Sequence, residues 1–161
     1  MTTVRPKASV VPFTHTASGT GVAQRVVVGG EAGHVIDVDT YPAFGGRDAA
    51  PSPLSYVLAA LSSCNQVTGS VVAKELGIAL GAWSFEVRGD LDTAVMVQGA
   101  EGDANFDSVT VTVSVETDAD QATFERLAAE TERRCPVTQL FRRSGLEYVS
   151  EWSRAPLPAR A

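Results

Sequence analysis

Residues 52–77 read SPLSYVLAALSSCNQVTGSVVAKELG, and this stretch decides the fold. Ser52 suits a helix N-cap, and Pro53 suits the first helical position, where its missing N–H is harmless. Gly77 is a natural helix stop. Because small residues line much of the rest, we expect a central, heavily buried helix. Residues at steps of three and four form its mostly apolar inward stripe: Leu54, Val57, Leu58, Leu61, Cys64, Thr68, Val71, Val72 and Leu76.

Strands are predicted on both sides of this helix. Residues 26–28 and 34–39 are β-branched runs around a Gly-containing connection, which is typical of a hairpin. After the helix, residues 83–89 alternate between apolar and polar side chains, which indicates a strand. Valines at every second position of residues 109–115 indicate a further strand with one buried face. Residues 146–152 are the last predicted strand.

A second helix is predicted late in the chain. It opens at residues 118–120, turns an apolar side inward, and runs to Cys135, where Pro136 interrupts or restarts it. Residues 98–107 are predicted to be a turn-rich connection. The order strand–strand–helix–strand–strand–helix–strand predicts an α+β fold with a largely antiparallel sheet. The expected inward residues of the second helix are Phe124, Leu127, Ala128 and Thr131.

The length of 161 residues fits one domain. Residues 1–20 are rich in Thr, Ser and Pro, so we expect an extended N-terminal arm there. The domain is then predicted over residues 21–152, and residues 153–161 are expected to be a C-terminal tail. The aromatic side chains are interpreted as core rather than as a cofactor site; they are Trp83, Phe85, Phe106 and Phe124.

Composition and charge exclude several classes of function. The net charge is −6, and the thirteen basic residues are scattered, which argues against a nucleic-acid surface. No apolar run approaches the roughly 20 residues that a spanning helix needs, so we expect no membrane role. Because the N-terminus has no continuous apolar core, it does not read as a signal peptide, and the expected location is cytoplasmic.

Metal and cofactor sites are not supported by the sequence. His15 and His34 are the only histidines, too few and too far apart for a zinc site. Residues 29–33 are glycine-rich but lie within a hairpin and open no helix, so they are not a dinucleotide fingerprint. We therefore expect neither a metal nor a cofactor.

The two cysteines carry the functional question. Cys64 and Cys135 stand 71 residues apart, each with apolar neighbours on its own helix face. They can be inert buried thiols, since free Cys is among the most buried residue types. They can also be a redox pair, in which one thiolate attacks a peroxide O–O bond and the other captures the resulting sulfenic acid as a disulfide. Periodicity alone leaves both interpretations open.

Two motifs are recognisable. The first is SPLSYVLAALSSC at residues 52–64, and the second is RCPVTQL at residues 134–140. Together with the Tyr-Pro…Gly-Gly loop at residues 41–46, they resemble the two cysteine motifs of the OsmC/Ohr family. The resemblance covers roughly residues 22–150, and it rests on the pair of motifs rather than on either one alone.

This resemblance implies an OsmC-like fold, in which an antiparallel sheet packs with a long central helix, and an intertwined homodimer with active sites at the subunit interface. It also implies an antioxidant enzyme of the oxidative stress response that reduces organic hydroperoxides. By motif, Cys64 is the attacking residue and Cys135 the resolving one, and a dithiol reductant would restore the pair.

A cation beside Cys64 is physically required for this chemistry. Cys64 lies about three turns into its helix, too far from the N-terminus to profit from the helix dipole. Apolar burial raises the pKa of a thiol, so a guanidinium has to counter it. In family members an Arg near the first hairpin does this. Arg25, twelve residues before Asp37, matches that Arg best, and Arg47 is the rival.

The sequence departs from the family at one point. Family members carry a Glu near the start of the central helix that orients the Arg, whereas residues 54–56 are Leu, Ser and Tyr. Asp48 and Ser55 are the auxiliary candidates for its role. The loss leaves open a second hypothesis, a non-catalytic member that binds a small apolar ligand or acts as a redox-responsive interaction protein.

Overall fold

The structure is a computed structural model that describes residues 9–29, 31 and 33–158. The chain divides into two compact units, Met1–Ser55 and Tyr56–Ala161, and each is described by itself. The single domain expected over residues 21–152 stays a prediction.

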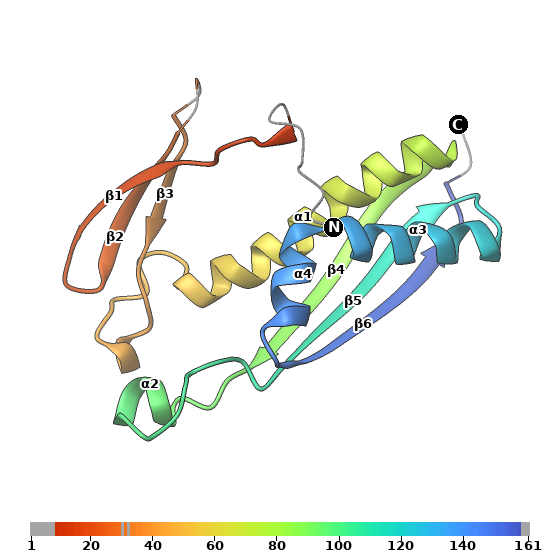
Figure 1. The fold of residues 1–161 in the computed structure, drawn as a ribbon. Coiled ribbons are helices and arrows are strands. Elements are labelled where there is room, and N and C mark those ends of the chain that lie inside the picture. Colours follow the sequence, from red (N-terminus) through yellow and green to blue (C-terminus); the bar gives the residue numbers. More distant parts are fainter. Residues whose placement is uncertain (1–8, 30, 32, 159–161) are drawn as a thin grey trace, which may run out of the picture. The chain divides into compact units, whose positions relative to one another are not determined.

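The first unit contains a three-stranded antiparallel sheet (Figure 1). Its strands are β1 (His15–Thr20), β2 (Ala23–Val28) and β3 (Val35–Val38). The predicted hairpin is confirmed as β2 and β3. Strand β1 was not predicted, because these six residues belong to the expected arm; residues 1–8 of that arm lie outside the described residues. A short 3-10 helix, η2 (Pro42–Phe44), follows β3.

The second unit contains a sheet in the order β4-β5-β6. Its strands are β4 (Leu80–Asp90), β5 (Ser108–Thr117) and β6 (Glu147–Ala155). The α+β class is confirmed, and β4 and β5 are antiparallel as expected, but β5 and β6 are parallel. A parallel pair needs a crossover of a dozen or more residues, which the helices after β5 supply. Strand β6 also includes the first three residues of the expected tail.

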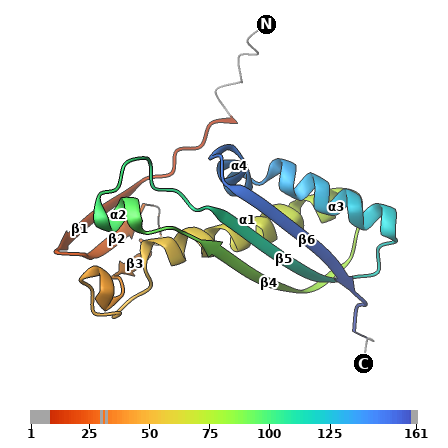
Figure 2. The same ribbon diagram turned by 90° about the horizontal axis from the view of Figure 1, so that it is seen from below.

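Four helices complete the second unit. They are α1 (Pro53–Leu76), which begins in the first unit, α2 (Ala94–Gln98), α3 (Gln121–Arg134) and α4 (Pro136–Arg143). Helices α1, α3 and α4 lie on one face of the sheet (Figure 2). The bounds of α1 and α3 agree with the sequence prediction to within a few residues, and α4 is the restart of the helix that was expected at Pro136, whereas α2 was not predicted. None of the helices among the described residues has the length and apolar character that a membrane span requires.

The core lies between this sheet and its helices. The four alternating valines of β5, residues 109, 111, 113 and 115, are at most 1% exposed, which confirms the buried face. They pack against Leu61 of α1, Phe141 of α4 and Leu127 of α3. The four aromatic side chains that the sequence predicts to be core belong to this core, as expected.

The prediction of a heavily buried α1 is wrong for this chain. Five of its 24 residues are buried: Leu61, Asn65, Gly69, Val72 and Ala73. Several apolar residues of the predicted stripe are exposed instead: Leu54, Val57 and Val71. The buried side of α1 therefore differs from the predicted apolar side, because a polar residue, Asn65, and a small residue, Gly69, lie at the centre of the buried side.

The start and the end of α1 follow local chemistry. Ser52 is buried, and its Oγ accepts a hydrogen bond from the Ser55 backbone N–H at 3.1 Å, which satisfies one free donor of the first turn. The two hydroxyl oxygens lie 2.9 Å apart. Gly77 has a φ of 69°, a left-handed conformation that ends the helix and that glycine adopts without strain.

Candidate functional site

The structure brings Cys64 and Cys135 together. Cys64 lies in the middle of α1 and is half-buried, whereas Cys135 stands between α3 and α4 and is fully buried. Both are free thiols, and the side chain of Cys135 is hydrogen-bonded with that of Cys64. Two residues that are 71 positions apart in sequence are therefore neighbours in space, within the second unit.

The N-terminus of α4 contributes a backbone N–H to each sulfur. Cys135 is the N-cap, and its Sγ accepts a hydrogen bond from the N–H of Thr138 at 3.4 Å. Pro136 has no N–H to offer. The N–H of Val137 donates to Cys64 Sγ, and the hydroxyl of Thr68, one turn along α1, is a further hydrogen-bond partner of that sulfur. The Cys-Pro dipeptide thus starts a helix whose free donors face the two sulfurs.

Within the second unit, the contacts of Cys64 favour its protonated form. Burial raises the pKa of the Cys64 thiol above its ordinary value, and the hydrogen bond with the Cys135 side chain raises it further. The hydrogen bonds of Val137 and Thr68 lower this pKa, but they do not reverse the rise. None of the groups that dominate this pKa in the described part of the chain is a cation.

Two buried polar side chains behind the sulfurs were not predicted from the sequence. Asn65, the residue after Cys64, donates from Nδ2 to Thr138 Oγ1 at 3.1 Å and to the Leu61 carbonyl at 2.8 Å. Asn65 is 1% exposed, and Thr138 is fully buried. The sequence signal for them is weak: a polar residue four positions after a core leucine, and a threonine three positions after a cysteine.

The remaining predicted site residues lie in the first unit. Arg25 is opposite Asp37 in the β2–β3 register, and the two form an exposed ion pair with Nε 3.0 Å from Oδ1. The backbone N–H of Arg47 donates to Asp39, and Asp48 has a left-handed backbone with a φ of 54°. Ser55 takes part in the N-cap of α1. Their roles toward Cys64 stay predictions.

Asp39 organises the loop that carries Arg47 and Asp48, and the sequence analysis missed it. Its buried carboxylate accepts the backbone N–H groups of Ala49 at 3.0 Å and of Arg47 at 3.1 Å. These hydrogen bonds, that of Ala49 foremost, hold the pKa of Asp39 below its ordinary value. Hydrogen bonds to the Asp39 carboxylate therefore hold the backbone of this loop in place.

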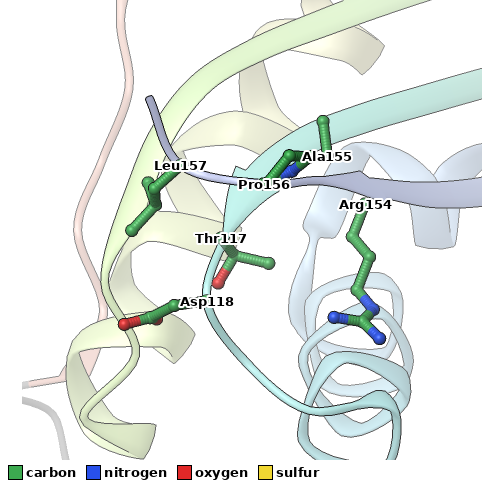
Figure 3. A pocket seen from close by; sticks show the side chains of 6 residues that line it. All are labelled: Thr117, Asp118, Arg154, Ala155, Pro156 and Leu157. Carbon is green, nitrogen blue, oxygen red and sulfur yellow. The ribbon is translucent and has the colours of Figure 1, made fainter. Parts of the chain in front are cut away.

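A separate pocket of about 540 Å³ lies where β5 and β6 end. Figure 3 shows Thr117, Arg154 and Leu157 around it. Arg154 donates to the Ala119 carbonyl at 2.8 Å. No cysteine lines this pocket, so it is distinct from the dithiol. Among the described residues, no group of three His, Cys, Asp or Glu side chains is arranged to hold a metal ion.

Comparisons with known proteins agree on one fold. A search of curated proteins gives no match. One similar solved structure is an OsmC-like protein from Mycoplasma pneumoniae, with a TM-score of 0.74 and 15% sequence identity over 90% of this chain and 98% of that one. A second is an organic hydroperoxide resistance protein OsmC from Legionella pneumophila, with a TM-score of 0.70 and 20% identity over 90% of this chain and 98% of that one. A third is the organic hydroperoxide resistance protein OhrB of Bacillus subtilis, with a TM-score of 0.59 and 22% identity over 89% of this chain and 98% of that one.

These identities show the fold alone. The family is shown by the sequence itself, because residues 45–148, well over half of the chain, match the family of OsmC-like proteins. This range includes both cysteines and the helix N-terminus between them. The chain therefore belongs to the OsmC family.

Proposed function

We propose that this protein is a thiol peroxidase that reduces organic hydroperoxides to alcohols in the cytoplasm. The observation that carries the proposal is the contact between the Cys64 and Cys135 thiols. Two of the similar structures are of proteins named for organic hydroperoxide resistance, which favours the same substrate class.

The reaction has two steps on the protein. The Cys64 thiolate attacks the distal oxygen of ROOH, the O–O bond breaks, and the alkoxide takes a proton to leave as ROH, while Cys64 becomes a sulfenic acid. Cys135 then attacks that sulfur, water leaves, and a disulfide forms. A dithiol reduces the disulfide and closes the cycle. Consumption of cumene hydroperoxide with a dithiol present tests the proposal; a parent protein no faster than the protein-free mixture would contradict it.

The apolar surroundings of Cys64 support an organic rather than a mineral peroxide. Val57 and Val71 each lie seven residues from Cys64, so the three residues share one side of α1. Val57 is 43% exposed and Val71 is 48% exposed. An alkyl chain placed on this side gains free energy by covering apolar surface that water otherwise contacts.

The same exposed side of α1 supports a homodimer. Val67, which is 67% exposed, extends the apolar side of the helix that includes Val57 and Val71. Exposed apolar residues that gather on one helix are typical of a protein–protein contact, and a second copy of this chain is the proposed occupant. We expect a mass in solution near twice the 16.9 kDa of one chain in sedimentation equilibrium. A single species of one chain's mass at micromolar concentration would contradict the dimer.

A guanidinium has to counter the raised pKa of Cys64, and we propose that Arg25 supplies it. The pH at which Cys64 reacts at half its maximal rate with iodoacetamide is expected to lie below the ordinary thiol value in the parent protein. In Arg25→Ala it is expected to rise above that value, because burial and Cys135 then dominate the pKa. The pH profile of alkylation, followed by peptide mass spectrometry, is the measurement.

Arg47→Ala is the matched control, because it removes the rival guanidinium from the same unit. A rise in this variant alone would assign the role to Arg47. No rise in either variant would contradict a cationic partner and would favour the second candidate, a non-catalytic OsmC-like protein that binds a small apolar ligand or acts as a redox-responsive interaction protein. The uncharged Ser55 and the raised pKa of Cys64 are the observations that favour that candidate.

A further inference from the structure

We infer that Asn65 and Thr138 are positioning residues that hold the two sulfurs within bridging distance; this inference rests on the proposed redox role of the cysteines. Asn65 follows Cys64 directly in α1, and Thr138 is the third residue of α4, the helix that Cys135 caps. Neither residue contacts the peroxide in the proposed reaction. Each is instead attached to the backbone that carries one of the two thiols.

The contacts of Thr138 link both helices to the sulfurs. Its Oγ1 accepts a hydrogen bond from Asn65 Nδ2 at 3.1 Å and lies 3.4 Å from Asn65 Oδ1, to which it donates. Its backbone N–H donates to Cys135 Sγ at 3.4 Å. Thr138 therefore joins α1 through its side chain and Cys135 through its backbone, so the hydrogen bond to Asn65 sets the distance from the start of α4 to Cys64.

Because Asn65 and Thr138 are buried, the hydrogen bonds between them favour one position of α4 along α1. Asn65 and Thr138 are at most 1% exposed, in a region where α1 and α4 otherwise pack through apolar side chains such as Leu61 and Phe141. Any displacement of α4 along α1 would leave the Thr138 hydroxyl and the Asn65 amide oxygen buried without the hydrogen bonds that they make to each other's side chain, which is costly. Buried polar pairs of this kind can fix one helix register against its neighbours. The register fixed here is the one that places the sulfurs together.

Two nearby residues serve as controls. Thr131 in α3 is also fully buried, but its hydroxyl has no hydrogen-bond partner among the described residues. Tyr148 of β6 lies beside Thr138, whose side chain affects the pKa of its hydroxyl, a pKa that burial raises. Thr131→Val thus removes an equally buried hydroxyl without removing a bond, and Tyr148→Phe tests whether Thr138 acts through β6 instead of through α1.

The experiment measures how readily the dithiol closes. The reduced protein is equilibrated with glutathione, according to P(SH)₂ + GSSG ⇌ P(S–S) + 2 GSH, and the disulfide fraction is read by thiol trapping and mass spectrometry. In Thr138→Val the equilibrium constant is expected to fall about tenfold, because the thiols are no longer held side by side. A tenfold fall makes the reduction potential more positive by about 30 mV.

The controls keep this test specific. Thr138→Ser keeps the hydroxyl and is expected to restore the parent value, whereas Thr131→Val and Tyr148→Phe are expected to leave it unchanged. Circular dichroism checks that each variant is folded, and Asn65→Ala, which removes the same bond from the α1 side, takes the place of Thr138→Val if that variant does not fold. Asn65→Ala is expected to show the same tenfold fall.

A Thr138→Val protein with the parent equilibrium constant would overturn the inference, and so would a Tyr148→Phe protein that reproduces the fall. A loss of stability without a change in potential would also overturn it, because the pair would then be structural only. The equilibrium requires no peroxide, so it stands apart from the proposed function: a protein that consumes no hydroperoxide can still show the potential shift.

Discussion

Cys64→Ser is expected to lower the rate of cumene hydroperoxide consumption by on the order of a thousandfold or more, because the serine hydroxyl cannot replace the thiolate as a nucleophile. The substitution is nearly isosteric, and Cys64 is only half-buried, so the fold should persist. Steady-state consumption with a dithiol as reductant is the measurement. A Cys64→Ser protein as active as the parent would remove Cys64 from the reaction.

Cys135→Ser is the matched variant, and its expected behaviour differs in kind. It retains the first step, so one equivalent of peroxide is consumed rapidly, but the Cys64 sulfenic acid then has no thiol to capture it. Trapping with dimedone is expected to label Cys64 strongly in Cys135→Ser and weakly in the parent protein. Equal labelling in both proteins would show that Cys135 does not resolve the sulfenic acid.

Gly69→Val is expected to destabilise the protein while leaving both cysteines intact. Gly69 is buried, and a Cβ at this position would lie 2.7 Å from Cη2 of Trp83. Trp83 cannot retreat freely, because it stacks on Phe85 and meets Trp152 edge-on. Overpacking of this kind costs about 2–3 kcal/mol in the free energy of unfolding, which lowers Tm by about 4–12 °C in a chain of this size.

Ser70→Val is the control for this prediction, because it adds a valine one residue away on the exposed side of the same helix. It is expected to change the free energy of unfolding by less than about 1 kcal/mol. Urea unfolding followed by circular dichroism compares the two variants. Equal stability of Gly69→Val and Ser70→Val would contradict the close packing of α1 on Trp83.

The elements with strong local signals could be predicted from the sequence. Ser52, Pro53 and Gly77 set the ends of α1, because capping and helix termination depend on the residues at the ends themselves. Strand β5 was evident because its valines alternate without interruption. The Cys-Pro dipeptide at residues 135–136 marked the restart of the helix, since proline favours the first helical turn.

What could not be predicted depends on tertiary contacts. The six residues of β1, HTASGT, are all exposed and show no apolar alternation, so only their pairing with β2 makes them a strand. The direction of β6 relative to β5 follows from the crossover, not from its own sequence. The inward side of α1 was misjudged because apolar periodicity gives no weight to Asn65 and Gly69, which are buried for a hydrogen bond and for close packing.

The candidate site was accessible to the sequence only in part. No local pattern shows that Cys64 and Cys135 meet, and only the resemblance of their two motifs suggested it. No sequence motif indicates that backbone N–H groups at the start of α4 would contact the sulfurs, or that Asn65 would form a hydrogen bond with Thr138. These contacts follow from how α4 packs on α1, which no local pattern in the sequence reveals.

The central claim is that the Cys64 and Cys135 sulfurs form a redox pair that an organic hydroperoxide oxidises. The most direct test is intact-mass spectrometry of the reduced protein after one equivalent of cumene hydroperoxide, followed by mapping of the linked peptides without reduction. We predict a protein lighter by two hydrogen atoms, with the peptides of Cys64 and Cys135 joined. An unchanged mass, or a protein heavier by oxygen atoms with Cys135 still a free thiol, would contradict the account.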